Sequence, residues 1–349
     1  MARRSAARFY PGSCHGGSGS CVNGGAGGHA ARPRAYRFAY PDRGGWLAFV
    51  RGLPNGAAAA DAYARLYAAD DYAGWSEGRT TITSRINYTS GGLRVRGLLV
   101  EPRTPGRHPA IVYNHGGIGR YGRIVLADVL EMNRIAARGY VVLASTFRGE
   151  GGSEGRPDYG GGDANDALAL LPLLDTIPNA DAARVGMWGF SRGGLTTYAA
   201  LARSGRIAAA VVQGGPTDLV HDPRRSEFDR FVYPDAIPDY RRDPRGELVR
   251  RSPIRWPERL APRTAILLLH GGDDPRVRPA DSLAMAGELQ RLHRSYRLKI
   301  YEGEGHDLLG AFADVRVEMD RWFDRYVRDG APPPRNGVTK LPPEVTEAK

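Results

Sequence analysis

Short apolar segments recur along the chain from residue 80 onward, and each is rich in β-branched or aliphatic residues almost throughout. Such segments predict strands that are buried on both faces, as the strands of a parallel sheet are. Two segments come first, Thr80–Tyr88 and Leu93–Val100, and they predict a β-hairpin that turns at Ser90-Gly91-Gly92. The later predicted strands are Ala110–Asn114, Val141–Ser145, Val185–Trp188, Ala208–Gln213, Ala265–His270 and Tyr296–Tyr301.

Segments of helical character separate most of these strands. They are Ile124–Arg138, Asp163–Leu174, Arg192–Arg203, Ala280–Leu292 and, after the last strand, Leu309–Val327. Because strand and helix alternate, the sequence predicts an α/β protein with a mostly parallel central sheet, an antiparallel start and helices on both faces. Residues 218–262 interrupt the alternation with proline, arginine and aromatic residues, and we expect this insertion to form a cap over the strand ends.

The two ends of the chain differ in character from this main domain, which we assign to residues 79–330. Residues 1–35 are predicted to form a disordered leader, since residues 12–28 contain eight glycines and almost nothing that packs. Residues 36–78 carry many aromatic side chains and an alanine-rich helical stretch, and they are expected to dock on the main domain. Residues 331–349 form a proline-punctuated tail that is also predicted to be disordered.

Composition and charge exclude several classes of protein. Hydrophobic residues make up 42% and charged residues 25% of the 349, which is a globular composition. Residues 1–51 contribute +7 of the net charge of +11, so the folded part has no strong basic character and nucleic-acid binding is not expected. No apolar run is long enough to span a membrane and no secretory signal is evident, which favours a soluble cytoplasmic protein.

Metal binding is not expected either. Cys14 and Cys21 both lie in the glycine-rich leader. Together with His15 and His29 they lack the paired spacing that is typical of zinc sites, and two cysteines make no disulfide framework.

The sharpest motif is Gly189-Phe190-Ser191-Arg192-Gly193, a G-x-S-x-G pentapeptide between a predicted buried strand and a predicted helix. This context is typical of a nucleophile elbow, in which a tight turn projects the serine hydroxyl at a helix N-terminus. The alternative is a glycine-rich turn in which Ser191 only caps the helix.

A serine hydroxyl needs a base and a group that orients the base. His306 follows the last predicted strand in a glycine-flanked loop, and it is the histidine with the right position in the chain. His270 ends a strand, where a structural hydrogen bond is expected. Asp273 and Asp274 follow the preceding strand, and their spacing alone does not choose between them as the acid.

The oxyanion of the reaction needs hydrogen-bond donors. The backbone N–H of Arg192, the residue after the serine, is one candidate. The second is expected from the loop at Asn114-His115-Gly116-Gly117, where glycines allow the main chain to approach a substrate closely, and we select His115 and Gly116.

The same loop contains a competing motif. The segment Gly117–Gly122 matches G-x-G-x-x-G between a strand and a helix, which would suggest an NAD-binding oxidoreductase. However, the next strand ends in Ser145-Thr146, where an acidic ribose-binding residue would be expected. A dinucleotide site is therefore the remote alternative, and no cofactor is expected.

Taken together, five motifs resemble the catalytic domain of the prolyl oligopeptidase family of serine hydrolases, over roughly residues 80–328. They are HGG at 115–117, FRGEGGSEG at 147–155, GFSRGG at 189–194, HGGDDPRV at 270–277 and GEGH at 303–306. The resemblance implies an α/β-hydrolase fold, with Ser191 as nucleophile and His306 as base. The family pattern H-G-x-x-D-x-x-V selects Asp274, which stands three residues before Val277.

Two departures from the family bear on the substrate. Peptidases of this family usually carry a large N-terminal β-propeller, and the 79 residues before the hairpin are too few for one. Many also place a tyrosine after the third strand whose hydroxyl assists the oxyanion hole, whereas His115 stands there in this chain and Tyr113 lies two residues earlier. The HGG loop instead resembles esterase loops, in which backbone amides provide the donors.

The sequence therefore predicts a serine hydrolase that acts through an acyl-Ser191 intermediate. Small peptides or aminoacyl amides are the preferred substrates, and small carboxylic esters are the alternative. Arginines of the insertion could receive a substrate carboxylate or form a solvated surface; they are Arg224, Arg225, Arg230, Arg241 and Arg242. The oligomeric state is not indicated.

Overall fold

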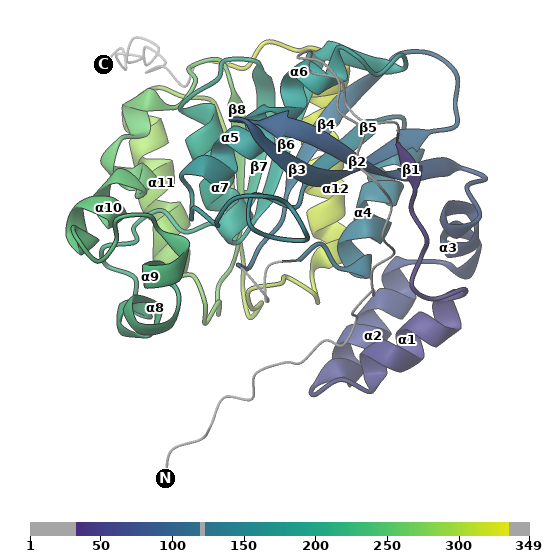
Figure 1. The fold of residues 1–349 in the computed structure, drawn as a ribbon, viewed down its shortest axis with the longest axis horizontal. Coiled ribbons are helices and arrows are strands. Elements are labelled where there is room, and N and C mark those ends of the chain that lie inside the picture. Colours follow the sequence, from purple (N-terminus) through teal and green to yellow (C-terminus); the bar gives the residue numbers. More distant parts are fainter. Residues whose placement is uncertain (1–32, 119–122, 335–349) are drawn as a thin grey trace, which may run out of the picture.

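A nine-stranded sheet forms the centre of the computed structural model, which describes residues 33–118 and 123–334 (Figure 1). The strand order is β1-β2-β3-β5-β4-β6-β7-β8-β9. The strands are β1 (Arg34–Ala35), β2 (Thr81–Ser90), β3 (Leu93–Pro102), β4 (His108–Asn114), β5 (Val141–Ser145), β6 (Ala180–Phe190), β7 (Ile207–Gln213), β8 (Ala265–Gly271) and β9 (Tyr296–Tyr301).

The mode of pairing between neighbouring strands changes once across the sheet, from antiparallel to parallel. Strands β1, β2 and β3 are antiparallel neighbours, and β3 is also antiparallel to β5. From β5 to β9 every pair of neighbours is parallel. This confirms the predicted α/β fold with an antiparallel start. Because β4 to β9 run the same way, the loops that follow them meet at one edge of the sheet.

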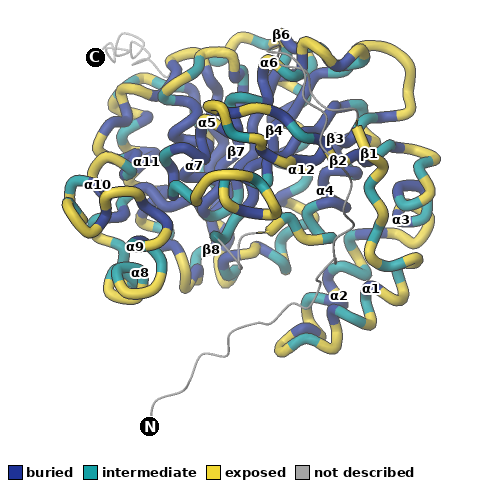
Figure 2. Tube along the Cα trace, in the orientation of Figure 1, coloured by how far each residue is buried: buried dark blue, intermediate teal, exposed yellow. Residues whose placement is uncertain are grey.

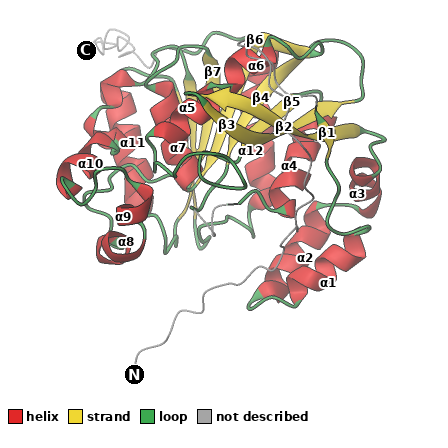
Figure 3. Ribbon diagram, in the orientation of Figure 1, coloured by secondary structure: helices red, strands yellow, loops and turns green. Residues whose placement is uncertain are grey.

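Helices cover both faces of the sheet (Figure 3). They are α1 (Arg43–Arg51), α2 (Gly56–Leu66), α3 (Ala69–Ser76), α4 (Leu126–Ala137), α5 (Gly162–Leu168), α6 (Leu170–Leu174), α7 (Arg192–Leu201), α8 (Arg225–Phe231), α9 (Tyr233–Ala236), α10 (Pro244–Arg250), α11 (Pro279–Arg291) and α12 (Phe312–Phe323). Short 3₁₀ turns at Pro253–Arg255 and Pro257–Arg259 follow α10, and a π turn at Asp324–Arg328 follows α12.

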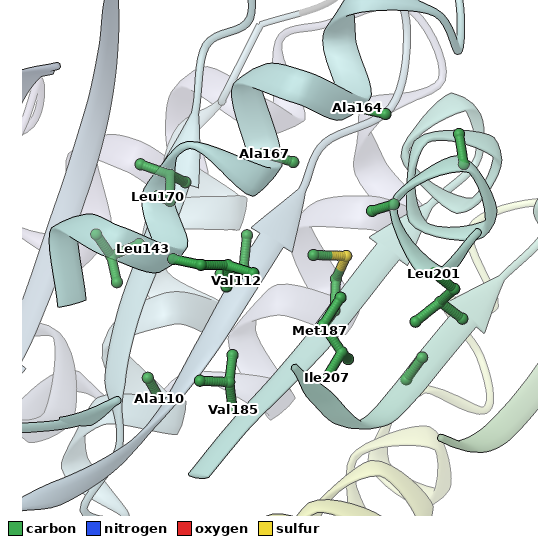
Figure 4. Packing of buried hydrophobic residues seen from close by; sticks show 14 of the residues in the cluster. Ala110, Val112, Leu143, Ala164, Ala167, Leu170, Val185, Met187, Leu201 and Ile207 are labelled. Carbon is green, nitrogen blue, oxygen red and sulfur yellow. The ribbon is translucent and has the colours of Figure 1, made fainter. Parts of the chain in front are cut away.

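Each face of the sheet has its own apolar core, because successive side chains of a strand point to opposite faces. Val112 of β4 belongs to a cluster that also contains residues of α5, α6, α7 and α11, as Figure 4 shows in part. Its neighbours Ile111 and Tyr113 pack with α4 and α12 on the other face. The central strands β4 to β8 are therefore mostly buried on both sides (Figure 2), which explains their nearly continuous apolar sequence. Strand β9, at the edge of the sheet, is only partly buried, so the prediction that it is buried on both faces was wrong.

The segment at residues 36–78, between β1 and β2 in the chain, packs beside α4. Its aromatic side chains form a cluster with Leu130 of α4, and the Tyr67 hydroxyl donates to the backbone oxygen of Ala127 at 3.3 Å. Arg316 of α12 donates to the Leu66 oxygen at 2.7 Å. Helices α1 and α2 thus lie below α4 in Figure 1.

The insertion at residues 218–262 contains α8, α9, α10 and the two 3₁₀ turns. Its aromatic residues Tyr233 and Tyr240 pack with Leu195 of α7 and Tyr159, so the insertion rests on the helix that follows the serine motif.

Several predicted elements differ from the observed ones by a few residues at their ends, and three further differences stand out. The predicted helix Asp163–Leu174 is two helices, because Pro172 has no N–H to donate and its ring would clash with the oxygen of Leu168, where α5 ends. Strand β6 begins five residues earlier than predicted, at Ala180. Arg34 and Ala35, assigned to the leader, pair with Arg85 and Ser84 of β2. The remainder of that leader, with Cys14 and Cys21, lies outside the described residues.

Candidate active site

The backbone of Ser191 is strained, with φ 55° and ψ −123°. Ser191 joins the end of β6 to the start of α7, and two glycines make this turn possible. A Cβ atom at Gly193 would lie 1.9 Å from the Asn114 oxygen, and one at Gly189 would lie 2.2 Å from the Gly193 oxygen. The glycines of the G-x-S-x-G motif are therefore required by the close approach of β6, α7 and the end of β4.

Two hydrogen bonds link Ser191 to residues far away in the chain. His306 Nε2 lies 2.9 Å from Ser191 Oγ, and His306 Nδ1 lies 2.7 Å from Asp274 Oδ2. His306 follows β9 and Asp274 follows β8, so all three side chains come from the same edge of the sheet. The neighbouring Asp273 is exposed, and its backbone N–H donates to Glu304. The structure thus brings Asp274, and not Asp273, to the histidine.

The Asp274 carboxylate is surrounded by hydrogen-bond donors. Its Oδ1 accepts from the N–H groups of Arg276 and Val277, at 2.8 and 3.0 Å. Its Oδ2 lies near His306 and, at 3.2 Å, near His270 Nε2. Burial alone would favour the neutral acid, but the hydrogen bonds from the two histidines outweigh it and hold the pKa of Asp274 well below its usual range.

His270 takes part in this arrangement, although the sequence predicted only a structural role for it. Its ring is fully buried at the end of β8. Its Nε2 faces two acceptors, the carboxylate of Asp274 and the Val277 oxygen at 3.0 Å, so Nε2 carries a proton. Its Nδ1 lies 2.7 Å from Ser282 Oγ on α11. The spacing of four residues between His270 and Asp274, across a tight turn, was the signal available in the sequence.

Backbone N–H groups lie close to Ser191 on its other side. Arg192 is the first residue of α7, so its N–H has no partner within the helix. The main chain of Gly116 packs against the serine, since a Cβ atom there would lie 3.0 Å from Ser191 Cβ. Both positions match those predicted for oxyanion donors.

The side chains of His115 and Tyr113 are directed elsewhere. The His115 ring is buried, its Nδ1 lies 2.9 Å from the Gly116 oxygen, and burial lowers its pKa to about 3. Within the described residues no hydrogen bond joins this ring to Ser191, so only the backbone of His115 remains a candidate donor. The Tyr113 hydroxyl donates to Asp128 at 2.7 Å and is not free to assist at Ser191.

A buried ion cluster lies next to the serine and was missed in the sequence analysis. The Arg192 guanidinium donates to both carboxylate oxygens of Glu150, each at 3.0 Å, and to Asp163 Oδ2 at 3.3 Å. It also packs over the ring of Phe147. All three charged side chains are at most 1% exposed. This cluster ties the FRGEGGSEG loop after β5 to the start of α7.

Among the described residues of this cluster, two carboxylates, those of Glu150 and Asp163, face one guanidinium, that of Arg192. Burial raises the pKa of Asp163 to about 7, with the charge of Glu150 adding to the effect and that of Arg192 opposing it. Asp163 therefore gains or loses its proton near neutral pH.

Comparison with known proteins agrees with this geometry. The family model described as "Prolyl oligopeptidase family" matches residues 127–329. The chain belongs to the prolyl oligopeptidase family. The resemblance inferred from the motifs is thus confirmed, and the chain is a serine-type hydrolase of a peptidase family.

Two curated relatives and one solved structure illustrate the relationship. The chain is 31% identical to "Uncharacterized peptidase YtmA" of Bacillus subtilis (strain 168), over 63% of this chain and 84% of that protein. It is 28% identical to "Uncharacterized peptidase YuxL" of the same organism, over 71% of this chain but 39% of that protein. An acylaminoacyl peptidase from Pyrococcus horikoshii has the same fold, with a TM-score of 0.59 and 24% identity over 71% of this chain and 42% of that one.

This chain therefore spans most of the length of YtmA. It spans less than half of the length of YuxL and of the archaeal enzyme. None of the helices within residues 33–118 and 123–334 combines the length and apolar character needed to span a bilayer.

The ion cluster leads to a pH-dependent prediction. Between about pH 4 and pH 7 the folded protein keeps a proton on Asp163 that the unfolded chain has lost, so this residue makes folding less favourable as pH rises. We expect Asp163→Asn to become more stable relative to the parent across this window. The gain is at most roughly 4 kcal/mol, since one pKa unit corresponds to about 1.4 kcal/mol.

Urea unfolding at pH 5 and pH 8 measures this difference. Asp175→Asn, at a largely exposed position, is the matched control and should show no such trend. The opposite trend, in which the parent protein becomes more stable relative to Asp163→Asn as pH rises, would contradict this prediction. It would show that the ionised Asp163–Arg192 pair stabilises the fold by more than the burial of the charge costs.

Proposed function

We propose that this chain hydrolyses peptide bonds in short peptides or aminoacyl amides through an acyl-Ser191 intermediate. The observation that carries the proposal is the continuous hydrogen-bonded series from Asp274 through His306 to Ser191, at 2.7 and 2.9 Å. Such a series is the arrangement that makes a serine hydroxyl nucleophilic at neutral pH.

In the proposed acylation step, Ser191 Oγ attacks the carbonyl carbon while His306 Nε2 takes its proton. The carbonyl oxygen becomes an oxyanion, which the N–H groups of Arg192 and of the loop at Gly116 stabilise. His306 then gives the proton to the leaving amine as the C–N bond breaks. In deacylation a water molecule attacks the ester, with His306 again taking and returning the proton. Asp274 stays ionised and stabilises the imidazolium.

Hydrolysis of small carboxylic esters is the second candidate. It is favoured by the direction of Tyr113, whose hydroxyl is held by Asp128, so that among the described residues the proposed oxyanion donors are backbone amides. Esters need less assistance from the enzyme than amides, because an alkoxide leaves the tetrahedral intermediate more readily than an unprotonated amide nitrogen does.

The proposal is tested first by labelling with a fluorophosphonate. We expect the parent protein to become labelled and Ser191→Ala to remain unlabelled, while Ser204→Ala reacts as the parent does. Ser191→Ala should also lower kcat at least about 10⁴-fold, which is the order observed when a triad member is removed. Labelling that persists in Ser191→Ala would refute the assignment of the nucleophile.

The substrate class is decided by comparing aminoacyl nitroanilides with short-chain nitrophenyl esters. We expect the parent protein to cleave nitroanilides. Its kcat/KM for these substrates should exceed that of the Ser191→Ala variant by several orders of magnitude. Turnover of esters alone would favour the esterase alternative.

His270 is proposed as a positioning residue that acts through Asp274. His270→Leu removes one donor from the carboxylate, and we expect kcat to fall about tenfold with KM unchanged, which corresponds to one hydrogen bond to a charged group. His270→Gln can place an amide N–H near the position of Nε2 and should recover most of the loss.

Ser282→Ala is the matched control, since it removes the contact on the opposite side of the same ring and leaves the donor in place. Equal loss of activity in His270→Gln and His270→Leu, with an unchanged thermal midpoint in both, would show that the N–H of His270 has no part in the reaction.

A further inference from the structure

A groove of about 670 Å³ lies between the antiparallel end of the sheet and the segment that enters α4. Five arginines line it: Arg34 of β1, Arg85 of β2, Arg94 and Arg96 of β3, and Arg123 before α4. No aspartate or glutamate is among its lining residues in the described part of the chain. The groove is therefore strongly positive.

Within residues 33–118 and 123–334, four of these arginines have no acidic partner. Arg94 pairs with Glu154 outside the groove at 3.1 Å, and Arg96 contacts the Gly151 oxygen at 3.4 Å. Arg85 packs over the ring of Tyr36. For Arg34 and Arg123 no ion pair is found with any residue of the described segments.

Three of the five arginines of the insertion that the sequence predicted as possible carboxylate receptors have acidic partners. Arg224 pairs with Asp222 at 3.8 Å, and Arg225 pairs with Asp229. Arg242 pairs with Asp239 at 3.7 Å. Arg230 packs over the ring of Phe231, and neither it nor Arg241 has an ion pair among the described residues. Three of the five arginines are thus paired within the insertion, whereas Arg34, Arg85 and Arg123 of the groove have no acidic partner in the described segments.

The groove and Ser191 lie at the same edge of the sheet. Gly97 of β3 pairs with Ser145, the last residue of β5, so Arg96 and Arg94 lie beyond the carboxyl end of β5. Ser191 follows β6, and the strand order from β6 is β4, β5 and β3. With neighbouring strands about 4.8 Å apart, the groove begins roughly 10–15 Å from the serine.

We propose that this groove binds the free C-terminal carboxylate of a short peptide, on the leaving-group side of the bond that Ser191 cleaves. The inference rests on the function proposed above and specifies its substrate. A guanidinium group binds a carboxylate through two parallel hydrogen bonds, and several unpaired arginines offer such a site. When a peptide bond is cleaved, the acyl part is the N-terminal side and the leaving amine is the C-terminal side. The free C-terminal carboxylate of the peptide therefore always belongs to the leaving part.

The separation sets the length of the preferred peptide. An extended chain covers about 3.3–3.6 Å per residue, so a carboxylate in the groove lies about three or four residues beyond the cleaved bond. The enzyme would then release C-terminal fragments of this length from short peptides.

The test uses pairs of peptides that are identical except for a C-terminal carboxylate or amide. The series places two, three, four or six residues after the cleaved bond, and product formation is followed by mass spectrometry. We expect kcat/KM to be roughly tenfold higher for the acid than for the amide at three or four residues, the order expected for a charge-assisted hydrogen bond. The ratio should fall as salt is added, because exposed charges are screened.

Arginine variants link this preference to the groove. Arg85→Gln combined with Arg123→Gln should bring the acid-to-amide ratio close to one without changing kcat/KM for a nitroanilide, which has no carboxylate on its leaving side. Arg65→Gln, at an exposed position of α2, is the matched control and should keep the parent ratio. If the double variant fails to fold, Arg123→Gln and Arg34→Gln are tested singly, and each should lower the ratio.

The outcomes separate this inference from the proposed function. Two outcomes would overturn the carboxylate site and leave the proposed peptidase function intact, provided that nitroanilides are still cleaved. One is an acid-to-amide ratio of one in the parent protein, and the other is a ratio that the groove variants leave unchanged. Failure to cleave any amide substrate, with esters still hydrolysed, would overturn the proposed peptidase function itself.

Discussion

The backbone of Ser191 is held in a conformation that costs of the order of 1–3 kcal/mol and persists only because its surroundings fix it. Gly193 is packed against the end of β4 and Gly189 against α7, so neither the strand nor the helix can move back to relieve the strain. The conformation aims the hydroxyl at His306 and leaves the N–H of Arg192 at the head of α7. The geometry of the site therefore follows from this one turn.

Charged side chains hold the turn from two directions. Arg192 is clamped by Glu150 through two hydrogen bonds of 3.0 Å, which joins the loop after β5 to the first turn of α7. On the other side Asp274 receives donors from its own loop and from two histidines. A buried carboxylate with so many donors remains ionised, and a buried guanidinium with a bidentate partner remains in place. Neither group has to rearrange when charge develops at Ser191.

The sequence was most informative where structure is local. Strands β5 and β9 have the bounds that their apolar runs predict, and the motif around Ser191 lies on the predicted strand–turn–helix unit. The interruption after α5 was missed because one proline outweighed the helical pattern around it.

The sequence predicted the meeting of Ser191, His306 and Asp274 but not the other contacts between distant residues. The partners of Arg192 lie 42 and 29 residues away, and nothing in their spacing indicates a pair. Spacing alone did not separate Asp273 from Asp274, and only the family pattern selected Asp274. The physical difference is the burial of Asp274, which depends on how the loops after β8 and β9 pack together. The direction of the Tyr113 hydroxyl likewise depends on α4, which packs beside it and supplies Asp128.

The most direct test of the account asks whether Ser191, His306 and Asp274 act as one unit. Single alanine variants and the triple variant are compared by kcat on one activated substrate. If the three residues work together, Ser191→Ala alone costs about as much as the triple variant, because the remaining two have nothing left to activate. Losses that multiply from the single variants to the triple variant would mean that the residues act independently, and would contradict the mechanism.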